Sequence, residues 1–184
     1  EGLREKVDAG IPVFWIKQEN ENWVKNNPEI TLNIQTETYK YPSVNIIGKI
    51  EGTDPKLKNE YVLLSGHQDH DGIRHPVKND TIYNGADDNA STCVAILAMA
   101  RAYKKQPSKR SILFVIHGAE ERGLLGSRWH AAHPVVPKES IVAVLNGDMI
   151  GRNDNNEAAL LGGEAPHKNS EELVKMALDA NNES

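Results

Sequence analysis

The chain has 184 residues, of which 26% are charged and 39% hydrophobic, and its formal net charge is -5. This composition predicts one soluble globular domain, and the mild negative charge argues against nucleic acid as a partner. The apolar runs are far shorter than the ~20 residues of a membrane span, so we expect neither a membrane-spanning segment nor a signal peptide in this chain. The single cysteine, Cys93, excludes an intrachain disulfide, and we expect it to pack in the core.

Taken in chain order, the hydrophobic pattern predicts alternating strands and helices. The predicted strands cover residues 10–16, 31–36, 43–50, 61–66, 111–116, 141–145 and 158–161, and the predicted helices cover residues 20–29, 90–104, 124–132 and 171–180. The strands at 31–36 and 43–50 are expected to form an N-terminal antiparallel hairpin. The β–α–β–α–β order that follows predicts parallel crossovers with helices on both faces of the sheet. We therefore predict a three-layer α/β/α fold with a mostly parallel mixed sheet.

Several chemically active side chains follow a predicted strand or open a predicted helix. They are His67, Asp87, Asp88, Glu120, Glu121 and Asp148. In a sheet of this kind ligands lie beyond the carboxyl ends of the strands, so we expect these side chains along one rim. Carboxylates gathered there without a cation would repel one another at a cost of order a few kcal/mol. The combination therefore indicates a metal site.

Each of these residues also has an ordinary interpretation when taken alone. An aspartate at residues 87–88 suits a helix cap, His67 suits a hydrogen-bonded loop, and residues 120–121 suit the charged entry of a helix. Zincin, phosphate-loop and nucleophile-elbow motifs are absent from the sequence. His117 is a candidate for contact with the site, whereas the remaining histidines are interpreted as surface or packing residues: His70, His75, His130, His133 and His167.

Four ordered motifs resemble those of a known enzyme family. They lie at residues 65–69, 85–91, 118–127 and 146–152 and read SGHQD, GADDNAS, GAEERGLLGS and NGDMIGR. At these positions the chain is similar to metallopeptidase family twenty-eight, the co-catalytic dizinc aminopeptidases. The similarity extends over about residues 43–152 and implies a zinc exopeptidase-like fold.

The resemblance implies a set of metal ligands for two zinc ions. Asp87 would bridge the ions, His67 and Asp148 would complete the protein ligands of one, and Glu121 would belong to the other. The family supplies a further histidine to the second ion from a position beyond Ser184. We therefore expect this chain to be the N-terminal part of a catalytic domain, and to bind metal weakly or at one position only.

The resemblance also implies an activity and a mechanism. The complete enzyme would hydrolyse N-terminal residues from peptides with a water or hydroxide shared by the two ions. Glu120 would be the general base, and Asp69 would orient His67 from outside the ligand set. The peptide bond between Asp87 and Asp88 is expected to be cis, as the turn of this family requires.

The domain organisation and two alternative functions also follow from the resemblance. Residues 1–20 resemble the tail of a protease-associated domain, and residues 21–184 resemble the catalytic domain. Peptide substrates and a secreted, periplasmic or extracellular location are implied. One alternative is a glutaminyl-cyclase-like aminoacyltransferase with a single zinc, against which His67 with Asp69 argues. The other is a non-catalytic, receptor-like binding domain, against which the intact ligand set argues.

Overall fold

A computed structural model describes residues 10–11, 13–27, 29, 31, 33, 35, 37, 39–153, 157, 159–161 and 171–182. Its strands are β1 (Ile46–Ile50), β2 (Tyr61–His67), β3 (Gly72–Val77), β4 (Asp80–Tyr83), β5 (Ser111–His117) and β6 (Ile141–Asn146). Its longer helices are α1 (Glu21–Asn26), α2 (Thr92–Lys105), α3 (Leu125–Ala132) and α4 (Glu171–Asn182). Short helical turns lie at η1 (Gln18–Asn20), η2 (Ala86–Ser91) and η3 (Lys138–Ser140).

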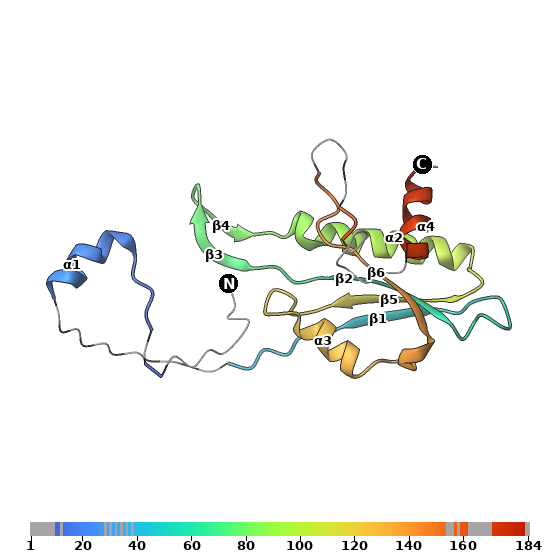
Figure 1. Cartoon of the computed structure of the whole chain (residues 1–184), viewed down its shortest axis with the longest axis horizontal. Coiled ribbons are helices and arrows are strands. Elements are labelled where there is room, and N and C mark those ends of the chain that lie inside the picture. The colour runs from blue at the N-terminus through green and yellow to red at the C-terminus, as the bar shows by residue number, and fades with distance from the viewer. Residues whose placement is uncertain are drawn as a thin grey trace.

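The main sheet has four strands in the order β1-β5-β2-β6 (Figure 1). The central strand β2 runs parallel to both β5 and β6, while β1 closes one edge antiparallel to β5. The register sets Leu64 of β2 opposite Phe114 of β5, and His67 opposite His117 at the ends of these strands. The mixed, mostly parallel sheet confirms the predicted fold class, and it brings the carboxyl ends of β2, β5 and β6 to one edge.

Helix α2 covers one face of this sheet because its apolar residues recur at helical spacing. Ile96, Met99 and Tyr103 lie three to four positions apart and pack against Leu64 and Phe114. Ile96 is almost fully buried, and burial of such a side chain contributes about 2 kcal/mol relative to leaving it exposed. The helix ends at a basic turn, as helix C-termini favour.

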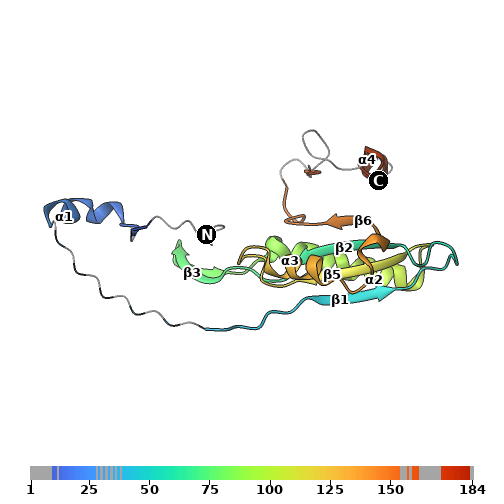
Figure 2. The ribbon, with the colours of Figure 1, turned by 60° about the horizontal axis from the view of Figure 1, so that its bottom comes forward.

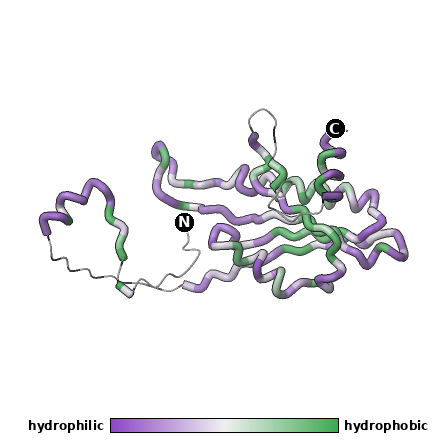
Figure 3. The backbone as a smooth tube through the Cα atoms, in the orientation of Figure 1, coloured by the Kyte–Doolittle hydropathy of each residue, from purple (hydrophilic) through white to green (hydrophobic). Residues whose placement is uncertain are grey.

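The opposite face of the sheet packs a second cluster, built on Leu63, Leu113 and Val115. His117 points to this same face by strand alternation, and its ring lies 5.8 Å from that of His130 on α3. Helix α3 therefore lies across the sheet from α2, and the view in Figure 2 shows the sheet with these helices. The central strands are the more hydrophobic part of the chain, whereas the segment with α1 is mainly hydrophilic and lies apart from the sheet (Figure 3).

The strands at 61–66, 111–116 and 141–145 and the helices at 90–104, 124–132 and 171–180 are confirmed within a few residues, although β6 is mainly exposed whereas β2 and β5 are buried. The N-terminal hairpin is not found among the described residues, because β1 pairs with β5. The strand expected at 31–36 falls partly outside the described residues, as does the one at 158–161, and the described residues of both lie in no strand. Residues 13–16, expected as a strand, are also non-regular.

The hairpin of β3 and β4 was not predicted. It forms a separate antiparallel sheet and lies, in chain order, between the end of β2 and the turn η2. Cys93 is half-buried on α2, and its thiol donates a hydrogen bond to the carbonyl of His67 at 3.0 Å. Among the described residues, no helix has both the length and the apolar character needed to cross a membrane.

Candidate metal centre

The carboxyl ends of the parallel strands carry the candidate site. His67 is the last residue of β2, while Glu120 and Glu121 follow β5. Asp148 follows β6, and Asp88 comes from the turn η2 that precedes α2. Because parallel strands end at the same edge, segments about 80 residues apart in sequence converge there.

His67 carries the clearest chemical signal in this site. Its side chain is almost completely buried, and its Nδ1 lies 3.0 Å from the backbone carbonyl of Asp69. A carbonyl only accepts, so Nδ1 must donate, and in the neutral ring Nε2 then carries a lone pair. That Nε2 is buried and forms no hydrogen bond in the described part of the chain.

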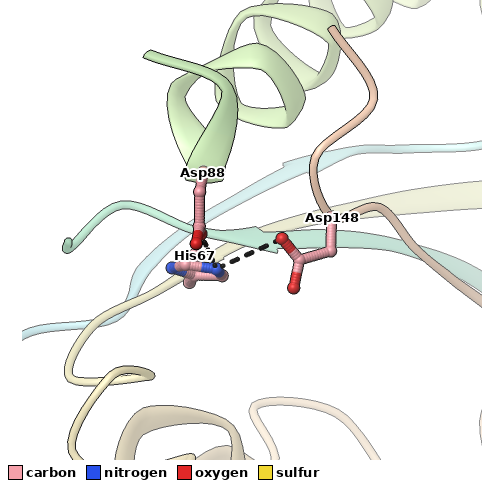
Figure 4. A group of neighbouring side chains, drawn as sticks. All are labelled: His67, Asp88 and Asp148. Atoms are coloured by element: carbon pink, nitrogen blue, oxygen red, sulfur yellow. Dashed lines mark ion pairs between the residues drawn. The ribbon is translucent and has the colours of Figure 1, made fainter. Parts of the chain in front are cut away.

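Three carboxylates surround this unpartnered nitrogen. The distances from Nε2 are 3.2 Å to Asp88 Oδ1, 3.6 Å to Asp148 Oδ1 and 3.9 Å to Glu120 Oε2. Figure 4 shows the side chains of Asp88 and Asp148 directed at the ring of His67. A lone pair that faces carboxylate oxygens is repelled by them unless a proton or a cation lies between.

A second group of donors adjoins the first. His70 Nδ1 donates a hydrogen bond to Glu121 Oε1 at 2.6 Å and lies 3.6 Å from Asp88 Oδ2. The described residues thus contain two sets of three donors, each within 4.8 Å: His67, Asp88 and Asp148 in one set, and His70, Asp88 and Glu121 in the other. Asp88 belongs to both sets and turns one carboxylate oxygen toward each histidine.

Asp88, rather than the expected Asp87, occupies the shared position. Asp87 belongs to neither set, and its Oδ1 accepts a hydrogen bond from the Gly151 N–H at 2.7 Å. Asp88 and Asn89 depart from helical φ/ψ within the turn, so successive side chains do not follow helical spacing there. The cis peptide bond likewise joins Asp88 to Asn89, not Asp87 to Asp88 as expected.

The loop that carries Asp148 is fixed by buried polar side chains. Asn89 is 1% exposed, donates to the Gly147 carbonyl at 3.0 Å and accepts from the Met149 N–H at 3.3 Å. The Asp87 hydrogen bond to the Gly151 N–H holds the same loop from the other side. The sequence analysis missed Asn89, although an amide beside the two aspartates at the start of a helix was the available signal.

Asp69 acts on the site differently from the expectation. Its carboxylate accepts hydrogen bonds from the backbone N–H groups of Glu120, at 2.9 Å, and Glu121, at 3.1 Å. Its Oδ1 is 3.9 Å from His67 Nδ1, which bonds the Asp69 carbonyl instead. Asp69 therefore orients His67 through its backbone and fixes the two glutamates through its carboxylate.

Two carboxylates of the site, Asp88 and Glu120, have raised pKa values. Burial raises the pKa of Asp88, and the charges of Glu121 and Asp148 raise it further, against a lowering by His70 and His67. Burial also raises the pKa of Glu120, which His67 lowers and the neighbouring carboxylates raise again. Each of these carboxylates is destabilised by its anionic neighbours, which a divalent cation would reverse.

The donors present fit zinc. Zinc binds imidazole nitrogen and carboxylate oxygen together, whereas magnesium and calcium prefer oxygen ligands alone. The orphaned Nε2 of His67 is the ligand atom such an ion needs, and the Asp69 carbonyl fixes its tautomer in the way that partners of metal-bound histidines do. His70, for which a surface or packing role was expected, is half-buried and belongs to the second set of donors.

A cavity of about 460 Å³ adjoins the site on the α3 face of the sheet. His67, Glu120, His117 and His130 are among its lining residues. His117 and His130 are both buried, and each has one ring nitrogen without a hydrogen bond among the described residues. Burial lowers the pKa of His117 to about 4, with contributions from His130 and His67. His117 thus adjoins the site, as its position predicts, and we expect it to be neutral near pH 7.

The fold and the donors define an α/β protein with a histidine–carboxylate metal site at the strand ends. The chain belongs to peptidase family M28, whose sequence model matches residues 45–184. It is 36% identical over 125 residues to aminopeptidase YwaD of Bacillus subtilis, covering 68% of this chain and 25% of that protein. It is 28% identical over 178 residues to a probable leucine aminopeptidase of Arthroderma otae, covering 92% of this chain and 46% of that protein.

The solved structures agree with this fold. A glutaminyl cyclase of Bacteroides thetaiotaomicron bound to N-acetylhistamine matches with a TM-score of 0.51 and 24% identity, over 61% of this chain and 43% of that one. A leucine aminopeptidase precursor from the same organism matches with a TM-score of 0.50 and 24% identity, over 60% and 43%. At this identity the two matches show the α/β fold alone. The chain spans less than half the length of the curated relatives named above.

Proposed function

We propose that this chain carries the catalytic site of a zinc aminopeptidase that hydrolyses N-terminal residues from peptides. The observation that carries the proposal is the buried Nε2 of His67, whose lone pair faces three carboxylates and has no hydrogen bond from any residue that the structure describes. A histidine with a purely structural role would have a donor at this position. Membership of peptidase family M28 and the aminopeptidase relatives support the reaction class.

Each donor has a role in this proposal. Asp88 would contribute to both zinc positions, in place of the expected Asp87. His67 and Asp148 would hold one ion, and Glu121 would belong to the other. The two oxygens of Asp88 face opposite histidines, an arrangement that supports a bridging carboxylate. Bound zinc would supply polarisation of the substrate carbonyl and a lowered pKa of water.

Glu120 is the general base in this mechanism. It carries no ligand role in either donor set, and its Oε2 lies 3.9 Å from His67 Nε2 at the edge of the site. Its carboxylate takes the proton of the attacking water and delivers it to the leaving amine. The Asp69 hydrogen bond to the Glu120 N–H fixes the backbone from which this side chain projects. Ala119, directly before it, has a left-handed φ of 54°, a strained position of the kind that gathers at active sites.

A substitution at Glu120 tests the mechanism. The assay, on the full-length enzyme, follows the amino acid released from peptides with a free N-terminus and from the same peptides after N-acetylation, with zinc content measured in parallel. Glu120→Gln is expected to lower kcat by about 10²–10⁴-fold with unchanged zinc content, since a general base contributes on that scale. Glu139→Gln, at an exposed position of η3, is the matched control and should leave kcat unchanged.

The outcomes separate the alternatives. Full activity of Glu120→Gln would remove this residue as the base. Equal cleavage of acetylated peptides would exclude an aminopeptidase, and loss of ammonia from a peptide with N-terminal glutamine would favour the cyclase alternative. A full-length enzyme that binds zinc and leaves every peptide intact would favour a binding domain. The secreted, periplasmic or extracellular location and the boundary at residue 20 stay predictions.

A further inference from the structure

Asn45 lies directly before β1, and its half-buried side chain bonds both ends of the loop that carries Glu120. Its Oδ1 accepts a hydrogen bond from the Gly118 N–H at 3.1 Å, and its Nδ2 donates one to the Gly126 carbonyl at 2.8 Å. Gly118 is the first residue after β5, and Gly126 lies in the first turn of α3. One side-chain amide therefore joins the start and the end of residues 118–126 from a position 73 residues before Gly118.

Hydrogen bonds within this loop make it one compact unit. The N–H groups of Gly123 and Leu124 both donate to the Glu120 carbonyl at 2.8 Å. Such bonds fix the shape of the loop, but they do not fix where the loop lies relative to the sheet. That placement requires bonds to other segments of the chain. Asp69 supplies them on one side through its carboxylate, and Asn45 supplies them on the other through its amide.

The loop packs closely against the segment that carries Asn45. An added Cβ at Gly118 would lie 2.6 Å from the Val44 carbonyl oxygen, and one at Gly126 would lie 2.5 Å from Asn45 Oδ1. Glycine at both ends of the loop therefore lets the backbone approach this amide. The antiparallel pairing of β1 with β5 holds the segment beside the end of β5. The amide thus sits on an edge strand of the main sheet, and the loop is referred to that sheet through it.

We propose that Asn45 is a positioning residue for Glu120. Its amide places the loop from which the proposed general base projects, and thereby sets the distance of that base from the donors at the end of β2. The inference rests on the proposed function for the role of Glu120, whereas the bonds of Asn45 are observed independently of it. A displacement of about 1 Å in a reacting group lowers the rate on the order of 10²-fold. In the competing, purely structural role, Asn45 would stabilise the fold and the loop would keep its place without it.

Amide hydrogen exchange tests the placement of the loop in this chain without metal or substrate. Nuclear magnetic resonance follows the exchange with a chelator present. Asn45→Ala should speed exchange at the Glu120 and Glu121 N–H groups about tenfold or more, since one lost hydrogen bond changes an opening equilibrium by about that factor. The amides of β2 and of the middle of β5 should keep their wild-type rates. Asn27→Ala is the matched control, because Asn27 donates a similar bond to a backbone carbonyl at the end of α1, and it should change neither set.

Asn45→Asp distinguishes the two bonds and serves as the test if Asn45→Ala does not fold. It keeps the shape of the side chain and the acceptor for the Gly118 N–H, but it places an oxygen where the donor to the Gly126 carbonyl was. The Gly118 amide should therefore stay as protected as in the wild type, while exchange at Glu120 and Glu121 rises. Wild-type exchange at these two glutamates in either variant would overturn the proposal. So would an equal rise throughout β2 and β5, because that result reports lost stability alone.

Kinetics of the full-length enzyme then connect the loop with the reaction. Asn45→Ala should lower kcat about 10–100-fold, with KM within about twofold and zinc content unchanged, because the base is displaced and the donors are not. Asn27→Ala should keep the wild-type kcat. An unchanged kcat in Asn45→Ala would overturn the positioning role, while the proposed function would stand. Full activity of Glu120→Gln would instead overturn the proposed base, whatever the exchange rates of the loop.

Discussion

His117 should make the folded chain sensitive to mild acid. It ends β5 with 8% of its surface exposed, so solvent does little to screen it. Burial lowers its pKa from 6.5 to about 4, with contributions from His130 on α3 and His67 on β2. The free energy of unfolding should fall between pH 7 and pH 5. We predict that this fall is smaller in His117→Gln than in the wild type.

The sign and the size of this effect follow from proton linkage. In the unfolded chain His117 binds a proton below about pH 6.5, whereas in the folded chain it binds one only below about pH 4. Between these values the unfolded state holds more protons, so the free energy of unfolding falls as pH falls. One pKa unit corresponds to about 1.4 kcal/mol, so the loss reaches about 2 kcal/mol at pH 5 and about 3 kcal/mol below pH 4.

The measurement is urea unfolding from pH 7 to pH 5 with a chelator present, so that metal binding does not contribute. The carboxylates of the site titrate in both proteins, and only the difference between wild type and His117→Gln reports on this histidine. The wild type should lose about 2 kcal/mol more than the variant over this interval. His75→Gln, at an exposed position, should follow the wild type. Parallel curves for wild type and His117→Gln would refute the reasoning, because a folding cost of the substitution itself does not depend on pH.

Two further pairs of substitutions test the geometry. Asp88→Asn should abolish zinc binding in equilibrium dialysis, whereas Asp87→Asn retains the acceptor for the Gly151 N–H and should keep zinc with at most about a tenfold loss. The reverse result would restore Asp87 as the bridging residue. Gly126→Ala should lower the free energy of unfolding by about 2–3 kcal/mol in urea, since its Cβ would lie 2.2 Å from the backbone oxygen of Gly118. Gly48→Ala meets no atom within 4 Å and should change it by less than about 0.5 kcal/mol; equal effects would contradict the packing.

The buried strands were predictable because their signal is physical and local. Runs such as residues 61–66 and 111–116 are apolar on both faces, and only a strand covered by helices on both sides buries such a run. The β3–β4 hairpin has no such signal, because its residues are mainly exposed. Its turn places Lys78 and Asn79 at φ of 50° and 71°, and lysine is an unusual residue for the first of these. Nothing in the pattern of the sequence marks that turn.

The sequence predicts which edge of the sheet carries the candidate site, but not which side-chain atoms form it. Strand ends fixed where His67, Glu121 and Asp148 would meet, since parallel strands share an edge. The choice between Asp87 and Asp88 depends on the φ/ψ values inside the turn, where Asp88 and Asn89 leave the helical region. The spacing of residues in the sequence does not distinguish Asp87 from Asp88. The position of His70 beside Glu121 and Asp88 was missed for a related reason: a histidine in a loop is usually a surface residue, and only the course of the loop brings its ring to these carboxylates.

The hydrogen bonds that position the donors come from groups outside the donor sets. The Asp69 carbonyl bonds His67 Nδ1, and the Asp69 carboxylate bonds the N–H groups of residues 120 and 121. Asn89 and Asp87 hold the loop of residues 147–151. These hydrogen bonds join protein groups only, so the folded chain itself orients the donor atoms. The folding free energy of the packed strands offsets the mutual repulsion of the carboxylates. A site built in this way gains affinity for a cation from the repulsion it relieves, because Asp88, whose pKa is raised by burial and by the charges of Glu121 and Asp148, is the donor that both sets share.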